Sequence, residues 1–231
     1  MQGSMPRAFT LLERVDTAEG PLELRQRDER DFMITIGPRV LMSSIIHRSE
    51  VAVAQRGCAP IQSRPAPRVL VGGLGLGYTL RAALDALPKR ATVHVAELNP
   101  VVERWCRGPL AKLTDNAVAD PRVKVLVGDV MQVVRKAAQG PATGRYDAII
   151  LDLYLGPADT PRGQEDPLYG PAALRATAQA LTDDGVYAVW SEEPNPAFEQ
   201  RLARLGFKLS WERNRGGGPR HALYVAQKRA H

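Results

Sequence analysis

Three acidic residues stand at the ends of three successive strand-like segments of this chain. Glu97 closes VHVAE, Asp129 follows the apolar run at 123–127, and Asp152 follows the run at 147–151. In an open parallel sheet, ligands bind outside the carboxyl ends of the strands, so these acids are expected at one edge. A carboxylate can accept hydrogen bonds from both ribose hydroxyls of a nucleoside. The pattern therefore predicts a nucleoside site, with Glu97 on the ribose, Asp129 on the adenine amino group and Asp152 near the reacting centre.

A glycine-rich turn precedes the first of these acids. The segment RVLVGGLGLGYTLR runs from an apolar strand through Gly73, Gly75 and Gly77 into a helix-like stretch at 78–87. Glycine permits positive φ and close approach of the backbone to a ligand, and a helix N-terminus adds outward N–H groups. Glu97 lies 20 residues after Gly77, as in a nucleotide-binding βαβ unit. The alternative is a tight turn, with each acid capping the helix that follows it. Three acids in register favour the ligand site.

Strand-like and helix-like segments alternate through the region that carries these residues. The expected strands are 68–72, 92–97, 123–127, 146–152 and 185–190, and the expected helices are 78–87, 100–113, 130–138, 171–181 and 195–205. A hairpin of 208–212 and 222–227 closes the chain. This alternation predicts a parallel sheet with helices on both faces and one antiparallel edge.

With these motifs the chain resembles the S-adenosylmethionine-dependent class I transferases, and among them the spermidine synthase-like (polyamine aminopropyltransferase-like) branch. The matching segments are VLVGGLGLGYTLRAAL, VHVAELNP, DPRVKVLVGDVMQVV, YDAIILDLYLGPAD and LYGPAALRATAQALTDDGVYAV. The resemblance implies an α/β, Rossmann-like class I methyltransferase fold with a seven-stranded, mostly parallel sheet. It implies that S-adenosylmethionine or its decarboxylated form is held by Gly73, Gly75, Gly77, Glu97 (ribose) and Asp129 (adenine), with Asp152 at the catalytic strand end.

The region before residue 60 has a different pattern. Polar and apolar residues alternate in LLERV, LELRQR and FMITI, which predicts a small antiparallel β extension, and a helix is expected near 49–56. We therefore divide the chain into an N-terminal β extension, 1–60, and an S-adenosylmethionine-binding Rossmann-like catalytic domain, 61–231. Residues 1–4 read as a cloning remnant before a native Met5. In the resembling family the extension helps to build a dimer, so a homodimer is one expected assembly.

Two departures from the resembling family bear on the reaction. Polyamine synthases carry an acid in the glycine turn where this chain has Leu76, and another three residues after the catalytic Asp where it has Leu155. Burying an unpaired ammonium group costs several kcal/mol. We therefore favour a methyltransferase acting on a small-molecule acceptor, with aminopropyl transfer from decarboxylated S-adenosylmethionine as the alternative. A cofactor-binding protein without catalysis and an NAD-type dehydrogenase are rival interpretations.

The mechanism expected from these residues is in-line displacement at the sulfonium carbon. Asp152 is the candidate base or acceptor anchor, and Tyr154 is expected to position the acceptor or to lie at the pocket rim. Glu192 and Glu193 follow the next strand, where a solvated loop is the simpler interpretation, and Trp190 is expected in the core.

Composition limits the remaining classes of function. The net charge is +6 and the pI about 9.6, but the arginines are dispersed, so nucleic acid is not an expected partner. The densest basic patch, at 213–220, reads as a solvated loop or a substrate lid. In the resembling family the loop at 156–169 closes over the acceptor, and we expect it to be mobile without ligand. Cys58 and Cys106 are too few for a disulfide framework, which suits a cytoplasmic protein, and neither a metal site nor a membrane segment is expected.

Overall fold

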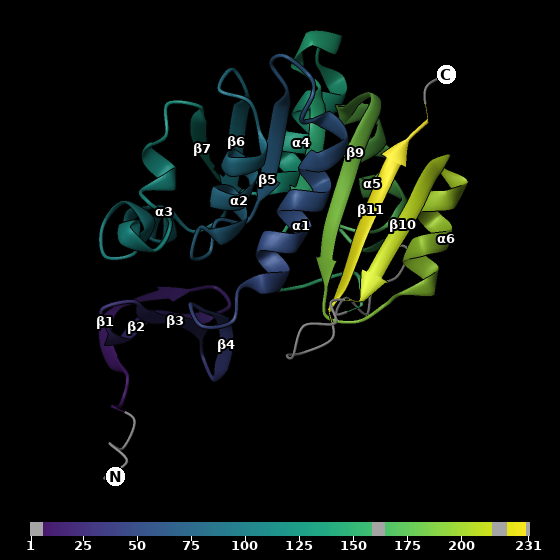
Figure 1. The fold of residues 1–231 in the computed structure, drawn as a ribbon. Helices are drawn as coiled ribbons and strands as arrows, with labels where there is room; N and C mark the ends of the chain where they lie inside the picture. The colour runs from purple at the N-terminus through teal and green to yellow at the C-terminus, as the bar shows by residue number, and fades with distance from the viewer. Residues whose placement is uncertain (1–6, 159–164, 214–220, 230–231) are drawn as a thin grey trace.

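The computed structural model describes residues 7–158, 165–213 and 221–229 (Figure 1). Its larger sheet has seven strands in the order β10-β11-β9-β8-β5-β6-β7. Their bounds are β5 (Arg68–Gly72), β6 (Thr92–Glu97), β7 (Val123–Val127), β8 (Tyr146–Leu151), β9 (Leu181–Ser191), β10 (Phe207–Arg213) and β11 (Ala222–Lys228). Strands β5 to β9 are parallel, and β11 is antiparallel to both β9 and β10. The predicted fold class is confirmed.

Helices cover both faces of this sheet. They are α1 (Arg48–Cys58), α2 (Tyr78–Ala86), α3 (Pro100–Arg107), α4 (Val130–Gln139), α5 (Pro171–Ala180) and α6 (Pro196–Arg204). Alternate side chains of a strand point to opposite faces, and β5 follows this rule. Val69 and Val71 are buried in the apolar cluster with α1, α2 and α3, whereas Leu70 lies in the cluster with α4, α5 and α6.

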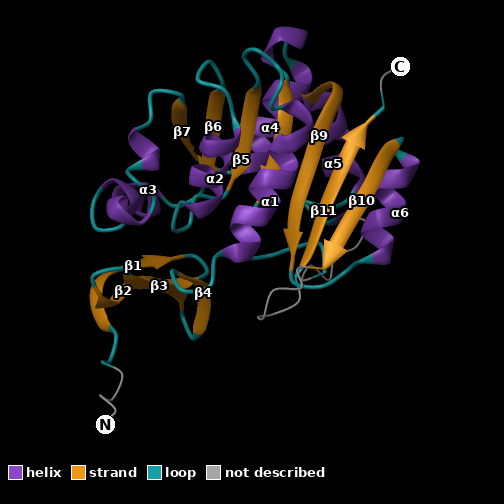
Figure 2. Ribbon diagram, viewed as in Figure 1, coloured by secondary structure: helices purple, strands orange, loops and turns teal. Residues whose placement is uncertain are grey.

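The N-terminal region forms a second, four-stranded antiparallel sheet in the order β1-β2-β3-β4. Its strands are β1 (Thr10–Thr17), β2 (Gly20–Asp28), β3 (Asp31–Ile36) and β4 (Arg39–Ser43). Figure 2 shows this small sheet next to the edge where the parallel strands end. Apolar side chains of its inner face, such as Leu22, Leu24 and Ile34, belong to the same buried cluster as β5 and β6. The extension therefore covers the carboxyl ends of the large sheet.

Several element boundaries differ from the sequence prediction. Helix α3 ends at Arg107 instead of continuing to residue 113, because Gly108 breaks the helix and the chain re-enters only short 3-10 turns. Strand β9 begins at Leu181, directly after α5, and β4 is a strand that the pattern did not single out. Residues 159–164 of the expected lid and 214–220 of the basic loop lie outside the described residues.

No helix of the described part of the chain is both long and apolar enough to cross a membrane.

Candidate functional site

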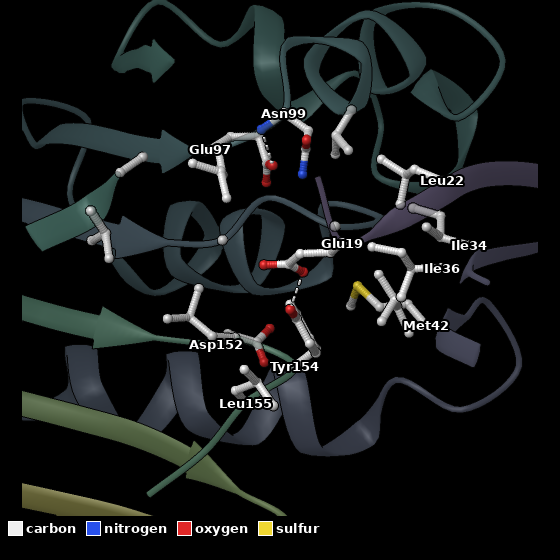
Figure 3. A pocket seen from close by; sticks show the side chains of 18 of the residues that line it. Glu19, Leu22, Ile34, Ile36, Met42, Glu97, Asn99, Asp152, Tyr154 and Leu155 are labelled. Carbon is white, nitrogen blue, oxygen red and sulfur yellow. Dashed lines mark hydrogen bonds between the residues drawn. The ribbon is translucent and has the colours of Figure 1, made fainter. Parts of the chain in front are cut away.

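A cavity of about 290 Å³ lies between the carboxyl ends of the parallel strands and the inner face of the small sheet. Figure 3 shows side chains of both sheets pointing into it. The described residues that line it include no lysine, arginine or histidine, and they include five carboxylates: Glu19, Glu50, Glu97, Asp129 and Asp152. The rest of the lining is mainly apolar. A cavity with this lining suits a cationic ligand that also has apolar parts.

The glycine turn between β5 and α2 forms one wall of the cavity. Gly73 and Gly75 line it, and both have positive φ, at 89° and 51°. A Cβ on Gly73 would overlap the carbonyl oxygen of Asp152, and a Cβ on Gly75 would overlap the sulfur of Met42 from β4. Gly77 does not line the cavity and begins α2 with a φ of 86°. The packing of the backbone therefore requires glycine at Gly73, and the positive φ favours glycine at Gly75 and Gly77, whether or not a ligand also approaches them.

Glu97 lies at the end of β6 and is only 7% exposed. One carboxylate oxygen accepts a hydrogen bond from the backbone N–H of Leu74, and the other from the backbone N–H of Asn99, both at 2.9 Å. Burial raises the pKa of Glu97, and these backbone hydrogen bonds oppose that rise. A carboxylate has about four lone-pair positions. Glu97 thus holds the glycine turn in place and retains acceptor capacity toward the cavity.

Asp129 follows β7 and lines the cavity near the exposed edge of the sheet. It is the N-cap of α4, and its side chain accepts a hydrogen bond of 2.8 Å from the backbone N–H of Met131. This is the capping role that the sequence left open. Because the carboxylate also faces the cavity, its second oxygen can still accept a hydrogen bond from an amino group.

Asp152 follows β8 and faces the cavity from the middle of the sheet. The hydroxyl of Thr79 in α2 donates a hydrogen bond to its carboxylate. Enclosure in the protein raises the pKa of Asp152 well above its ordinary value, and the nearby Glu50 carboxylate raises it further. Glu50, on α1, is 9% exposed and accepts a 2.6 Å hydrogen bond from Ser49. Asp152 is therefore a carboxyl whose affinity for a proton is raised, beside a second acid.

Tyr154 lines the cavity and is 37% exposed, so it lies at the mouth. Its hydroxyl donates a hydrogen bond to Glu19, which belongs to the turn between β1 and β2 (Figure 3). Desolvation and the Glu19 carboxylate raise the pKa of Tyr154 to about 12, so the phenol stays protonated and acts as a donor. Tyr154 thus connects the β8 strand end to the small sheet.

Sequence reasoning missed Glu19 and Glu50. Both lie in the N-terminal region, which the sequence describes only as a cover, and neither belongs to a motif. Only the placement of the small sheet and of α1 against the strand ends brings these acids to the cavity. Among the residues considered beyond the main site, Trp190 lines the cavity and also packs on the core, whereas Glu192 and Glu193 are exposed and do not line it.

The two leucines that replace acids also behave differently from each other. Leu76 is completely buried in the core and does not line the cavity. Leu155 does line it. The expectation that the two leucines leave an ammonium group unpaired in the pocket is therefore wrong, because Glu19 and Glu50 bring negative charge from other elements.

No group of three or more His, Cys, Asp or Glu side chains among the described residues could hold a metal ion.

The fold and the cavity together define a Rossmann-like α/β protein with acids at the carboxyl edge of its sheet. Residues 59–203 match the family described as the spermine/spermidine synthase domain, and the chain belongs to this family. The polyamine aminopropyltransferase of Clostridium tetani is 28% identical over 136 residues, which cover 58% of this chain and 44% of that protein. That of Mycobacterium tuberculosis is 33% identical over 148 residues, or 64% of this chain and 27% of that protein.

Solved structures show the same fold. The crystal structure of spermidine synthase from Thermotoga maritima matches with a TM-score of 0.71 at 17% sequence identity, covering 96% of this chain and 74% of that chain. A spermidine synthase in complex with the transition state analogue AdoDATO matches with a TM-score of 0.69 at 18% identity. The chain spans less than half the length of the two curated relatives named above.

These comparisons correct the expected reaction. The preference for a methyltransferase is wrong, because the matched family and the curated relatives are aminopropyltransferases. The physical reason is that the two leucines do not leave the cavity without acids. The residue types at 76 and 155 suggested that no acid was present for an amine, whereas the folded chain supplies Glu19 and Glu50 from its N-terminal region.

Proposed function

We propose that this protein is an aminopropyltransferase that uses decarboxylated S-adenosylmethionine and a small amine acceptor. The observation that carries the proposal is the charge of the cavity. Its described lining has five carboxylates and no basic side chain, and none of the ion pairs among the described residues involves these carboxylates. Glu50 and Glu97 are buried, and buried acids without a cation favour a ligand that brings its own positive charge.

The residues of the strand ends fit the nucleoside part of such a donor. Glu97 would accept from the ribose hydroxyls, since its carboxylate is already oriented by two backbone N–H groups. Asp129 would accept from the adenine amino group, and Gly73 and Gly75 would form the wall beside the ribose. When bound, decarboxylated S-adenosylmethionine supplies a propyl carbon activated by the adjacent sulfonium, with methylthioadenosine as the leaving group.

The acid beside the reacting centre has the properties of a general base. An alkylamine is protonated at neutral pH, and its ammonium form must lose a proton before the nitrogen lone pair can form a bond to carbon. Asp152 can take that proton because its pKa is raised toward neutrality, where a base works best. Thr79 holds the carboxylate in position through its hydroxyl. In this reaction the amine nitrogen forms a C–N bond to the propyl carbon, the C–S bond to the sulfonium breaks, and the proton of the ammonium group passes to Asp152.

The proposal is tested by incubating the protein with decarboxylated S-adenosylmethionine and putrescine and detecting the products by mass spectrometry. Methylthioadenosine and an aminopropylated amine are expected. Asp152→Asn should lower kcat by about 10²-fold or more, since general-base catalysis contributes this much, while methylthioadenosine binding stays within a few-fold. Binding of the nucleoside without product from any amine would contradict the proposal and would favour a non-catalytic binding protein.

Assembly and location remain predictions. A homodimer and a cytoplasmic location are consistent with the family, and neither is required by the chemistry of the cavity.

A further inference from the structure

We infer that Glu19, in the turn between β1 and β2, binds the second cationic group of the acceptor at the outer end of the cavity. This inference rests on the proposed function. It assigns to the small sheet a part in choosing the acceptor, in addition to covering the site. Glu19 is thus a specificity-determining residue supplied by a part of the chain that lies outside residues 59–203, which match the family.

The position of Glu19 is set by its turn. The hydroxyl of Thr17 donates a 2.7 Å hydrogen bond to the carbonyl of Gly20, and the same oxygen accepts one of 3.2 Å from the Glu19 N–H. These bonds close the turn on both sides of Glu19. The turn directs the Glu19 carboxylate toward Tyr154, as Figure 3 shows. Glu19 lines the cavity and is also exposed to solvent.

The hydrogen bond from Tyr154 leaves Glu19 able to bind a cation. A carboxylate has about four acceptor positions, and the phenol occupies one of them. Arg39 of β4 is close enough to Tyr154 to lower the pKa of its phenol, yet no described lysine or arginine forms an ion pair with Glu19. An ammonium group that arrives at the mouth of the cavity would therefore find a charged acceptor already oriented by Tyr154.

Apart from its acids, the lining of the cavity is mainly apolar. Glu50 is buried and Asp152 is partly buried, whereas Tyr154 and Glu19 are exposed, so we take the first two acids as the inner acids and Glu19 as the outer acid. Leu22, Ile34, Ile36, Leu41, Met42, Leu153 and Leu155 line the cavity with them. A ligand with two positive ends and a hydrocarbon middle matches a lining that combines inner and outer acids with apolar side chains. A monoamine of the same length would leave Glu19 without a cation.

The inference is tested with Glu19→Gln, which keeps size and hydrogen bonding but removes the charge. Glu29→Gln is the matched control, because it makes the same change on the exposed surface of the same small sheet, away from the cavity. Each protein is assayed with decarboxylated S-adenosylmethionine and two acceptors, putrescine and 1-aminobutane. Methylthioadenosine binding, measured by calorimetry, reports on the nucleoside part of the site.

We expect Glu19→Gln to raise the KM for the diamine at least about tenfold, the effect of losing one charged hydrogen bond, with little change in kcat. The KM for the monoamine, methylthioadenosine binding and the behaviour of Glu29→Gln should stay near wild type. An unchanged diamine KM, or an equal loss for both amines, would overturn the assignment of Glu19 while leaving the proposed function intact. If the wild-type protein transferred an aminopropyl group to neither amine, the proposed function and this inference would both fail.

Discussion

Burial and the neighbouring Glu50 carboxylate both disfavour the charged form of Asp152, and the pKa of this carboxyl is raised as a result. The same residue is the candidate base, which must be deprotonated to work. Two carboxylates at close range without a cation are costly to fold. The site therefore shows a conflict between stability and activity that single substitutions can measure.

Asp152→Asn should stabilise the protein most at high pH. The unfolded chain loses this proton near pH 3.8, whereas the folded chain keeps it to a higher pH, so the wild-type free energy of unfolding falls as the pH rises between these values. The asparagine variant does not titrate. Its Tm should exceed the wild-type Tm by more at pH 8 than at pH 4, at roughly 2–4 °C for each kcal/mol in a chain of this size. An equal Tm difference at both pH values would show that the folded protein does not disfavour the charged form of Asp152.

Glu50→Gln should move the pH dependence of the reaction. The change removes the negative charge beside Asp152 and keeps a side-chain oxygen that can accept from Ser49. The pKa of Asp152 should fall, so the acidic limb of the kcat/KM profile should shift to lower pH. The profile is measured with methylthioadenosine release as the readout. A limb that stays in place would mean that another group controls the pH dependence.

Among the elements, the contact of β4 with the glycine turn fixes the small sheet on the large one. Met42 lies against Gly75, where a larger residue would collide with the sulfur. Glu13 of β1 adds a second connection, since its carboxylate accepts hydrogen bonds from Arg104 and from the Trp105 indole of α3. The wall that the small sheet gives to the cavity thus depends on contacts between residues that are far apart in the sequence.

Gly75→Ala should destabilise the protein and weaken binding of the acceptor. The matched control is Gly37→Ala, because Gly37 has the same φ of 51° but nothing within 4 Å of the added Cβ. Both variants carry the strain of a positive φ, of order 1 kcal/mol. Only Gly75→Ala also displaces Met42, which should cost about 1–3 kcal/mol more. Urea unfolding of the two variants measures the difference, and equal destabilisation would show that the Met42 contact is not important.

The sequence predicts regular elements well where the pattern has clear ends. The bounds of β5, β6 and β7 agree with the predicted 68–72, 92–97 and 123–127, because apolar runs end at a glycine or an acid. The end of α3 was missed because the apolar pattern continues beyond Gly108 into 3-10 turns.

The site could be predicted only in part. The acids at the three strand ends share the edge of one sheet, which follows from the parallel topology. Glu19 and Glu50 could not be found, since their position depends on how a separate sheet and α1 pack. Leu76 was misjudged because the direction of a side chain between two glycines of positive φ cannot be read from residue types.

At the scale of the whole molecule, the cavity and the rest of the protein differ in charge. The chain has a formal net charge of +6, yet the described lining of the cavity contains only acidic charges. The negative charge needed for an amine is therefore a local property, produced by two sheets and one helix that meet at one place. Composition alone gave no indication of it.

A homodimer is expected from the exposed apolar side chains of the small sheet region. Val40 in β4, and Ile45 and Ile46 just after this strand, are each more than half exposed. Exposed apolar surface of this kind is typical of interaction sites. Light scattering should give twice the mass of one chain, and Ile45→Asp should give the mass of one chain. A wild-type protein that is monomeric at high micromolar concentration would contradict this expectation.

The central claim, that the acidic cavity serves aminopropyl transfer, is tested most directly by giving the protein both possible donors together with putrescine. Mass spectrometry then identifies the alkylated product and the released nucleoside. We predict an aminopropylated diamine and methylthioadenosine from decarboxylated S-adenosylmethionine, and no product from S-adenosylmethionine. A methylated diamine with release of S-adenosylhomocysteine would contradict the account.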